Sequence, residues 1–465
     1  MTGTCSTVPF GNLLPPASRV AGHGVRTLTD RPNMIRLCFW LATALLLAAC
    51  QPPVRLMPAP AMFVKSEHNL FAANPDQDPN SDIQVFYATN RVPFGPPSAR
   101  AYTIFPSDNL HLGTSTLSIG GSGRTWDWLY ELSTNESAGD RPQILLESMQ
   151  ETAAITAGTS LESPGEDALA FFRQIDEALA RSPDRNLTVY VHGANTAVGR
   201  ATAQAAQYRH FTGRNSVVLA FMWPSAENFM RFSRDVANAG RTAPTFAQLL
   251  RLLAEHTRAE EINVIAYSSG AMVATPALEL LGKAEDGYDP RRLRLGEVYF
   301  PAPDADFRHF VTALQSYSEY PRRVTVTANL HDSVLVLSRL HQRASRVGRP
   351  DPTELNAEDS QWLIKASQDP NLDLISAHYE DLPSMERTSH IFWYDDPWVS
   401  SDVFVKLLFH LTPEERGLQE NHNENQLQYW TFPADYEKRL GIVIEGLSQA
   451  AQEANAGDPP APPAP

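Results

Sequence analysis

The chain of 465 residues is poor in cysteine, with only Cys5, Cys38 and Cys50, all within its first fifty residues. A fold held together by disulfides is therefore excluded for the rest of the chain. CxxC, HExxH and GxxxxGK[ST] patterns are also missing, so zinc, thiol-redox and nucleotide chemistry have no local signature. These absences leave chemistry that uses no cofactor and no metal, or no chemistry at all.

Basic residues are also scarce: 38 Lys and Arg stand against 53 Asp and Glu, which gives a formal net charge of −15. This balance argues against nucleic acid as a partner, because phosphate backbones are bound by clustered Lys and Arg. Hydrophobic residues make up 43% of the chain and charged residues 20%, as in globular proteins. A wholly disordered, collagen-like or coiled-coil chain is therefore excluded.

The apolar run at residues 37–50 is too short to cross a membrane, because it has 14 residues and a spanning helix needs about 20. Arg31 and Arg36 precede this run and small residues end it, which is typical of a secretory signal. Met34 stands where the true start of the protein could lie, in which case residues 1–33 are not translated.

The end of this run, Leu47–Cys50, resembles a bacterial lipobox, in which cleavage before the cysteine leaves its sulfur to carry a diacylglycerol. Gln51 follows in place of Asp, which in such lipoproteins implies the outer membrane. The resemblance predicts a protein of the bacterial cell envelope that is lipid-anchored on Cys50 and faces the periplasm. Residues 1–50 hold four Arg and one Asp, so the remaining chain carries −18, and we expect lipid rather than charge to hold it at the membrane. A plain secretory signal or a short buried helix is the alternative.

Composition divides the rest of the chain into four parts. Residues 51–80 are rich in Pro, Asn and Asp and predict a spacer without regular structure. Residues 81–150 are rich in Thr, Ser, Gly and aromatics and predict a small β-rich lead-in packed on the main domain. Residues 151–452 form the predicted main domain, and residues 453–465 predict a disordered Pro-rich tail.

The main domain alternates helical and strand patterns. Two helical stripes have apolar residues at i, i+3, i+4 and i+7, namely Ala168, Phe171, Phe172, Ile175 and Phe246, Leu249, Leu250, Leu253. Five short apolar runs predict strands, namely Leu187–Val191, Ser216–Met222, Ile262–Ala266, Val298–Phe300 and Val324–Ala328. This alternation predicts an α/β fold with a mostly parallel central sheet, helices on both faces, and ligand sites outside the carboxyl ends of the strands.

Ser268 is the candidate nucleophile, because it follows the strand Ile262–Ala266 at a tight turn before a predicted helix. Such a turn holds the hydroxyl above the sheet. The segment Ala266-Tyr-Ser-Ser-Gly270 resembles the G-x-S-x-G elbow of the α/β-hydrolases, with Ala266 in place of the first glycine.

The strand Leu187–Val191 runs into His192-Gly193-Ala194, the position at which α/β-hydrolases place a donor of the oxyanion hole. The resemblance therefore implies that the backbone N–H groups of Ala194 and Ser269 form this hole. We expect His192 to orient the loop rather than to act as the base.

In α/β-hydrolases the triad follows the chain order Ser, acid, His. Asp332 lies in the short loop after the strand Val324–Ala328 and is the preferred acid, with Asp304 as the rival. His390 opens an aromatic segment after a polar loop and is the preferred base, with His378 second. The other histidines after Asp332 are His341, His410 and His422, which have no comparable position.

The order of these landmarks resembles an esterase/lipase-like branch of the superfamily, formerly called domain of unknown function 900. The matching pieces are Val85–Arg91, Val189–Asn195, Trp223–Ser225, Ala266–Gly270, Ala302–Asp304, Asp332 with Leu337–Arg339, and His390 with Val399–Asp402. They cover roughly residues 83–415. Tyr267 and Ser269 stand where that family more often has His and Met.

The sequence therefore predicts a cofactor-free serine hydrolase that acts on a small or lipid-like ester through Ser268, His390 and Asp332. The ester is implied by the family resemblance alone, and the same groups could cleave a thioester or an amide. The alternative is a cell-envelope lipoprotein that uses the hydrolase scaffold only for binding.

Overall fold

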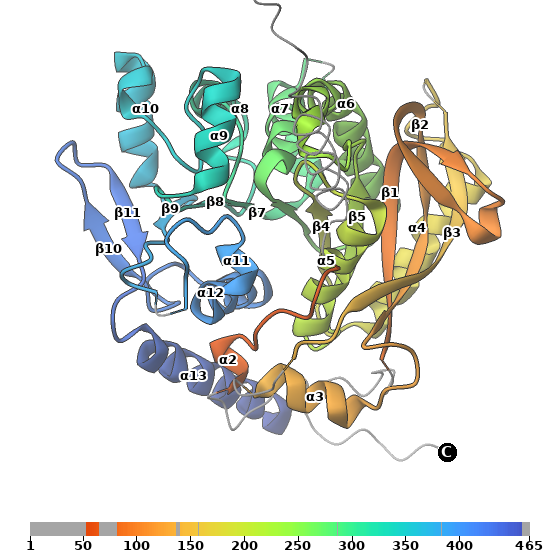
Figure 1. The fold of residues 1–465 in the computed structure, drawn as a ribbon, viewed down its shortest axis with the longest axis horizontal. Coiled ribbons are helices and arrows are strands. Elements are labelled where there is room, and N and C mark those ends of the chain that lie inside the picture. The colour runs from red at the N-terminus through yellow and green to blue at the C-terminus, as the bar shows by residue number, and fades with distance from the viewer. Residues whose placement is uncertain are drawn as a thin grey trace, which may run out of the picture. The chain divides into compact units, whose positions relative to one another are not determined.

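The computed structural model describes residues 53–64, 81–135, 140–156, 158–285, 287–382 and 384–457. Strands from these residues form one eleven-stranded sheet with the order β10-β11-β9-β8-β7-β6-β4-β5-β1-β2-β3 (Figure 1). In chain order the strands are β1 (Asp82–Phe94), β2 (Ala101–Ile119), β3 (Ile144–Ile155), β4 (Leu187–Val191), β5 (Val217–Met222), β6 (Ile262–Ala266), β7 (Leu295–Pro301), β8 (Arg323–Ala328), β9 (Leu372–Ser376), β10 (Gln419–His422) and β11 (Gln428–Thr431).

The central strands β4 to β9 are all parallel to their neighbours. Strands β4, β5, β6 and β7 are buried along their whole length, which explains why they are mostly apolar rather than alternating between apolar and polar residues. Their registers align the carboxyl ends at one edge, since Val191 pairs with Ala266 and Pro301 pairs with Thr327. The loops that follow these strands therefore meet at one place.

Helices cover both faces of the sheet, as the alternating pattern predicted (Figure 1). The face that one core cluster fills is covered by α4 (Glu166–Arg181), α6 (Phe232–His256), α7 (Ala271–Lys283), α8 (Phe307–Tyr317) and α10 (Ala357–Ser367). The opposite face is covered by α2 (Ala61–Val64), α3 (Trp126–Thr134), α5 (Val198–Phe211), α11 (Phe392–Asp395), α12 (Pro397–Phe409) and α13 (Tyr436–Gly457). Helix α9 (Ser333–Gln342) follows β8 at the carboxyl edge. The α/β fold class is confirmed.

The β-rich segment at the amino end is part of the same sheet. Strands β1, β2 and β3 form antiparallel pairs, and β1 also pairs in parallel with β5 from Phe86 to Thr89. The predicted boundary between residues 150 and 151 falls inside β3. At the other end α13 continues past residue 452 to Gly457, where the prediction placed the start of the tail.

Residues 53–64 correct the prediction of a spacer over 51–80. In this stretch Val54, Leu56, Met57, Met62 and Phe63 are buried against α5, α12 and α13. The backbone N–H of Met57 donates to Gln207 Oε1 at 2.7 Å. The prolines do prevent regular structure over most of the stretch, but the apolar residues between them can still pack as an irregular strap.

Candidate active site

The site begins at the sharp turn after β6. Ser268 has a φ of +52°, in the left-handed region that residues with a side chain rarely adopt. It opens a short 3₁₀ turn, Ser268–Gly270, that leads into α7. This strained turn is the geometry of a nucleophile elbow, and it places Ser268 at the carboxyl edge with 6% of its surface exposed.

Two glycines allow the elbow to lie close to the neighbouring strand. A Cβ atom on Gly193 would lie 3.0 Å from Ser268 Cβ, and a Cβ atom on Gly270 would lie 2.5 Å from the carbonyl oxygen of Val191. A side chain does not approach backbone as closely as 2.5 Å, so position 270 requires glycine, whereas a Cβ atom at position 193 would force Ser268 to shift.

Ser268, His390 and Asp332 form one continuous line of hydrogen bonds. Ser268 Oγ lies 2.7 Å from His390 Nε2, and His390 Nδ1 donates to Asp332 Oδ2 at 2.5 Å. The His390 side chain is 11% exposed and the Asp332 side chain is fully buried. The structure thus brings together three residues that come from widely separated parts of the chain.

Asp332 also begins helix α9. Its second oxygen, Oδ1, accepts from the backbone N–H groups of Val334 at 2.9 Å and Leu335 at 3.1 Å. This is the geometry of an N-cap, which sequence reasoning did not identify here. The two carboxylate oxygens therefore have separate tasks, because one holds the helix and the other holds His390.

Asn329 holds the loop that carries His390, and sequence reasoning missed it. Its Nδ2 donates to the carbonyl oxygens of Ser389 at 2.8 Å and Arg387 at 3.2 Å. Ser333 Oγ donates to the carbonyl of Thr388 at 3.3 Å. The turn that supplies the acid is thereby tied to the loop that supplies the imidazole. Asn329 directly follows β8, and a polar amide at the end of a buried strand is the sequence feature by which this role could have been predicted.

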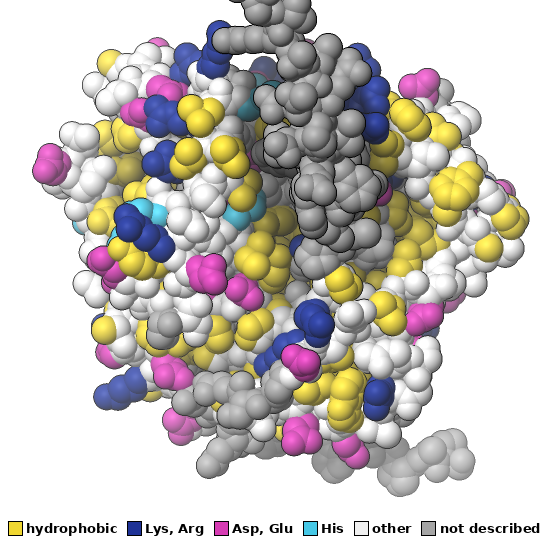
Figure 2. Space-filling view, in the orientation of Figure 1, with side chains coloured by type: hydrophobic (Ala, Val, Ile, Leu, Met, Phe, Trp, Pro, Cys, Tyr) yellow, Lys and Arg dark blue, Asp and Glu magenta, His cyan; other side chains and the backbone are white. Residues whose placement is uncertain are grey.

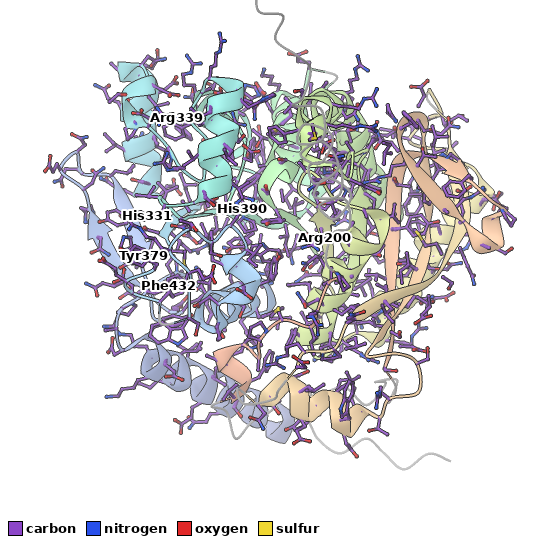
Figure 3. All side chains as sticks on the ribbon, viewed as in Figure 1. Arg200, His331, Arg339, Tyr379, His390 and Phe432 are labelled. Atoms are coloured by element: carbon purple, nitrogen blue, oxygen red, sulfur yellow. The ribbon has the colours of Figure 1, made fainter. Side chains whose placement is uncertain are left out.

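Tyr267 packs against His390 from the other side. The two rings lie 5.3 Å apart, and the hydroxyl of Tyr267 donates to the carbonyl oxygen of His390 at 3.4 Å. Burial raises the pKa of Tyr267 well above its ordinary value, so the phenol stays neutral. Figure 3 labels His390, with His331 and Tyr379 together to its left.

Asp304, the rival acid, is occupied elsewhere. Its carboxylate accepts from Ser269 Oγ at 2.9 Å, Ser338 Oγ at 2.6 Å and Arg346 Nε at 2.7 Å. Its backbone N–H donates to the carbonyl oxygen of Ser268 at 2.9 Å. Asp304 therefore joins the elbow to α9 and to the loop after it.

The backbone N–H groups of Ala194 and Ser269 are the two that we expect to form an oxyanion hole. The carbonyl oxygen of each of these two peptide groups accepts a hydrogen bond, which fixes the orientation of the peptide plane. In a trans peptide the C=O and N–H point in opposite directions. The carbonyl of Ser268 accepts from Asp304, which fixes the direction of the Ser269 N–H. The carbonyl of Gly193 accepts from His192 Nδ1 at 2.7 Å, which fixes the direction of the Ala194 N–H.

His192 lies in the loop it orients and not at the hydroxyl of Ser268. Its ring stacks on Trp223 with centroids 5.2 Å apart, and Trp223 Nε1 donates to the His192 carbonyl oxygen at 2.7 Å. Burial, assisted by the charge of Arg91, lowers the pKa of His192 to about 3. The ring is therefore neutral at ordinary pH.

Arg91 and Asp235 hold the rest of this loop, and sequence reasoning named neither role. Arg91 Nη2 donates to the Thr196 carbonyl at 2.9 Å, and its Nε donates to the Trp223 carbonyl at 3.0 Å. Asp235 Oδ2 accepts the backbone N–H of Asn195 at 2.9 Å. These contacts could be found only once β1, β5 and α6 lay side by side.

The alternative histidines have other partners. The His378 ring lies 5.2 Å from that of His331, and its Nδ1 accepts the N–H of Glu380 at 3.4 Å. His341 Nε2 lies 2.9 Å from Ser233 Oγ. His410 lies beside Glu297, and His422 lies in the hairpin of β10 and β11.

Cys50 lies outside the described residues, as does the rest of the predicted signal region. Within the described ranges, no helix has the length and apolarity to cross a membrane. The same ranges hold no group of three or more His, Cys, Asp or Glu placed to bind a metal ion.

Residues 168–382 match a family described as alpha/beta hydrolase of unknown function (DUF900). The resemblance stated from the sequence is confirmed over these residues, where the chain is similar to that family. The match contains Ser268 and Asp332 and ends before His390. It supports a hydrolase in general without specifying the bond that is cleaved. No curated protein matches the chain.

Proposed function

We propose that the protein is a serine hydrolase that cleaves carboxylic esters through Ser268, His390 and Asp332. One observation carries the proposal: Ser268 Oγ, the His390 ring and the Asp332 carboxylate form an unbroken hydrogen-bonded line with contacts of 2.7 and 2.5 Å. A hydroxyl becomes a useful nucleophile when an imidazole takes its proton, and a carboxylate sets the tautomer of that imidazole.

In the first half of the proposed reaction, Ser268 Oγ attacks the ester carbonyl carbon while His390 Nε2 takes the hydroxyl proton. The resulting imidazolium is stabilised by the buried Asp332 carboxylate. The tetrahedral intermediate then expels the alcohol, which takes the proton from His390. Ser268 is left as an acyl ester.

The backbone N–H groups of Ala194 and Ser269 stabilise the negative oxygen in this proposal. Because their peptide planes are already fixed by His192 and Asp304, little reorganisation is needed when charge develops. Each such donor contributes about 2.7 to 4 kcal/mol of barrier lowering in serine hydrolases.

In the second half, water attacks the acyl ester, gives its proton to His390, and the acid leaves as Ser268 recovers its proton. Preference for an ester over an amide or a thioester rests on the esterase/lipase-like resemblance of the chain.

A fluorophosphonate probe tests the reaction class. We expect covalent labelling of the wild type and its loss in Ser268→Ala, together with hydrolysis of p-nitrophenyl esters that falls about 10⁶-fold in the variant. A chain-length series of these esters reports the preferred acyl length. A folded wild type that neither labels nor turns over any ester would instead favour the non-catalytic binding protein.

We also propose that Cys50 carries a diacylglycerol and holds the protein in the bacterial cell envelope, at the outer membrane facing the periplasm. The support is the lipobox-like Leu47–Cys50. Metabolic labelling with an alkyne fatty acid should mark the wild type and not Cys50→Ser, and the variant should leave the membrane fraction. Equal labelling of both chains would contradict the anchor.

A further inference from the structure

Helix α9, which begins next to Asp332, exposes apolar side chains along its outer face. Leu335 and Ser338 point inward and are buried, whereas Val334, Leu337 and Leu340 follow at i, i+3 and i+6 on the outer side. Leu337 is 52% exposed and Leu340 is 72% exposed. The outer face of a helix in a globular protein is normally polar, so this stripe needs an explanation.

Neighbouring segments extend the stripe toward the site. Met230 is 77% exposed, Leu330 is 48% exposed, and Ile391 directly follows His390. We call these six residues the apolar rim, namely Met230, Leu330, Val334, Leu337, Leu340 and Ile391. They make up half of the twelve large apolar side chains that are exposed among the described residues, so they are not scattered at random.

Direct contacts join the segments that carry the apolar rim. Ser233 Oγ lies 2.9 Å from His341 Nε2, and the Phe232 ring lies 5.5 Å from the same imidazole. Arg349 Nε donates to the carbonyl oxygen of Leu330 at 2.8 Å. The start of α6, helix α9 and the loop after it therefore form one surface. Figure 2 shows hydrophobic side chains over α9 with Lys or Arg side chains beside them.

The same surface is rich in arginine, although the whole chain carries −15. Residues 228–234, 330–349 and 384–391 contain seven Arg and only two acidic residues, Asp332 and Glu386. Two of these arginines already face acidic partners, since Arg346 bonds to Asp304 and Arg339 to Asp351. The others are Arg231, Arg234, Arg343, Arg349 and Arg387.

We propose that the apolar rim and its arginines form a docking surface for an anionic lipid membrane. Leucine and methionine side chains can enter the headgroup region while arginines beside them contact lipid phosphates. Docking would bring Ile391, and with it the adjacent His390 of the Ser268 site, close to the lipid. It does not depend on the proposed hydrolysis or on the proposed anchor, because the surface consists of other residues.

Charge argues against a second copy of the chain as the occupant. A twofold contact through the apolar rim would bring the arginines of one copy against those of the other. The net charge of −18 predicted weak attraction of the body to anionic lipid, and the proposal departs from that expectation because arginines gather on one face.

Hydrogen–deuterium exchange of the full chain tests the proposal. Peptides spanning 330–343 should exchange more slowly when vesicles of phosphatidylglycerol are added, and much less so with phosphatidylcholine. The same protection should appear in Ser268→Ala, which separates docking from hydrolysis. A wild type that is protected by vesicles but neither labels with the fluorophosphonate nor hydrolyses any ester would sink the proposed function and leave the docking surface standing.

Variants at the surface give the sharper result. Leu337→Ser combined with Leu340→Ser should raise the vesicle concentration for half-maximal protection at least about tenfold, and Arg231→Gln with Arg234→Gln should raise it about tenfold. Ile442→Ser is the matched control, because Ile442 is 63% exposed on α13, and it should change nothing. Unchanged exchange at 330–343 with phosphatidylglycerol, equal protection by both lipids, or protection that grows with protein concentration alone would each overturn the proposal.

Discussion

Two of the regions in which the protein buries charged side chains use them differently. At the carboxyl edge, Asp332 contacts the His390 imidazole, which also contacts the Ser268 hydroxyl. On the face covered by α12 lies an ionic cluster, consisting of Glu297, Asp373, Asp402, Lys406 and Arg416. Lys406 Nζ lies 2.5 Å from Glu297 Oε2, and Arg416 Nε lies 2.6 Å from Asp402 Oδ1.

The two regions differ in whether a proton can be transferred between the buried groups. In the ionic cluster each carboxylate faces a Lys or Arg side chain, and all five side chains are at most 3% exposed. Arg323, which lies 3.2 Å from Asp373, supplies the third positive charge, so the charges balance and hold β7, β9 and α12 together. At the edge, the imidazole can accept a proton from one neighbour while the other stabilises its charge. The same residue types therefore give a fixed scaffold in one region and a proton relay in the other.

The largest effect is expected from Asp332→Asn. The amide can still accept from the N–H groups of Val334 and Leu335, so α9 keeps its cap and the free energy of unfolding should change little. It cannot set the same tautomer of His390, so kcat for a p-nitrophenyl ester should fall about 10⁴-fold. Ester hydrolysis assays measure kcat, and chemical denaturation of the same preparation measures the free energy of unfolding. A variant that loses stability and keeps kcat would show that Asp332 serves only as a cap.

Lys406→Met should act on stability alone. It leaves Glu297 buried without its cation, which should cost about 3 to 5 kcal/mol in the free energy of unfolding. Under conditions where the variant is folded, kcat should stay at the wild-type value. Lys283→Met is the matched control, because Lys283 pairs with Glu279 at the surface, and it should be nearly silent. If Lys406→Met lowered kcat without lowering stability, the ionic cluster would not have the purely structural role that distinguishes it from the site at Ser268.

Ser269→Ala should have a smaller effect at the site. It removes the hydroxyl that donates to Asp304 but keeps the backbone N–H of residue 269. We expect kcat to fall about tenfold, with KM unchanged, because a less firmly held N–H stabilises the transition state less well. Binding of a boronic acid that mimics the tetrahedral intermediate should weaken in parallel. An equal change in KM would point to substrate binding instead.

The smallest effect concerns acid stability. Burial raises the pKa of Glu297, but the charge of Lys406 and hydrogen bonds outweigh this and lower it from its ordinary value of 4.5 to about 2. The unfolded chain therefore binds a proton there at a higher pH than the folded chain does. The contribution to stability is present above pH 4.5 and is lost as the pH falls toward 2.

Denaturation at pH 6, 4 and 3 measures this contribution. The double variant Glu297→Gln, Lys406→Met lacks this ion pair. The free energy of unfolding of the double variant should therefore depend less on pH in this range than that of the wild type. Parallel curves for both chains would place the acid sensitivity elsewhere.

The sequence by itself determined the features that are local along the chain. The apolar runs of β4, β5, β6 and β8 and the turn at Ser268 were readable because strand burial and tight turns follow from adjacent residues. The choice of Asp332 and His390 came from chain order in a resembling family, and the structure places both within hydrogen-bonding distance of the right neighbours. Their catalytic roles stay predictions.

Only the tertiary structure decided what depends on contacts between distant segments. Asn329, Asp235 and Arg91 hold the loops of the site, but each acts on backbone groups of segments far from it in the sequence. The strap at 53–64 looked like a spacer, because proline content reports regular structure and not burial. The apolar rim could not be predicted from whole-chain charge and hydrophobicity, because these quantities are averages over all residues. The rim also consists of three segments that lie together only in the folded chain.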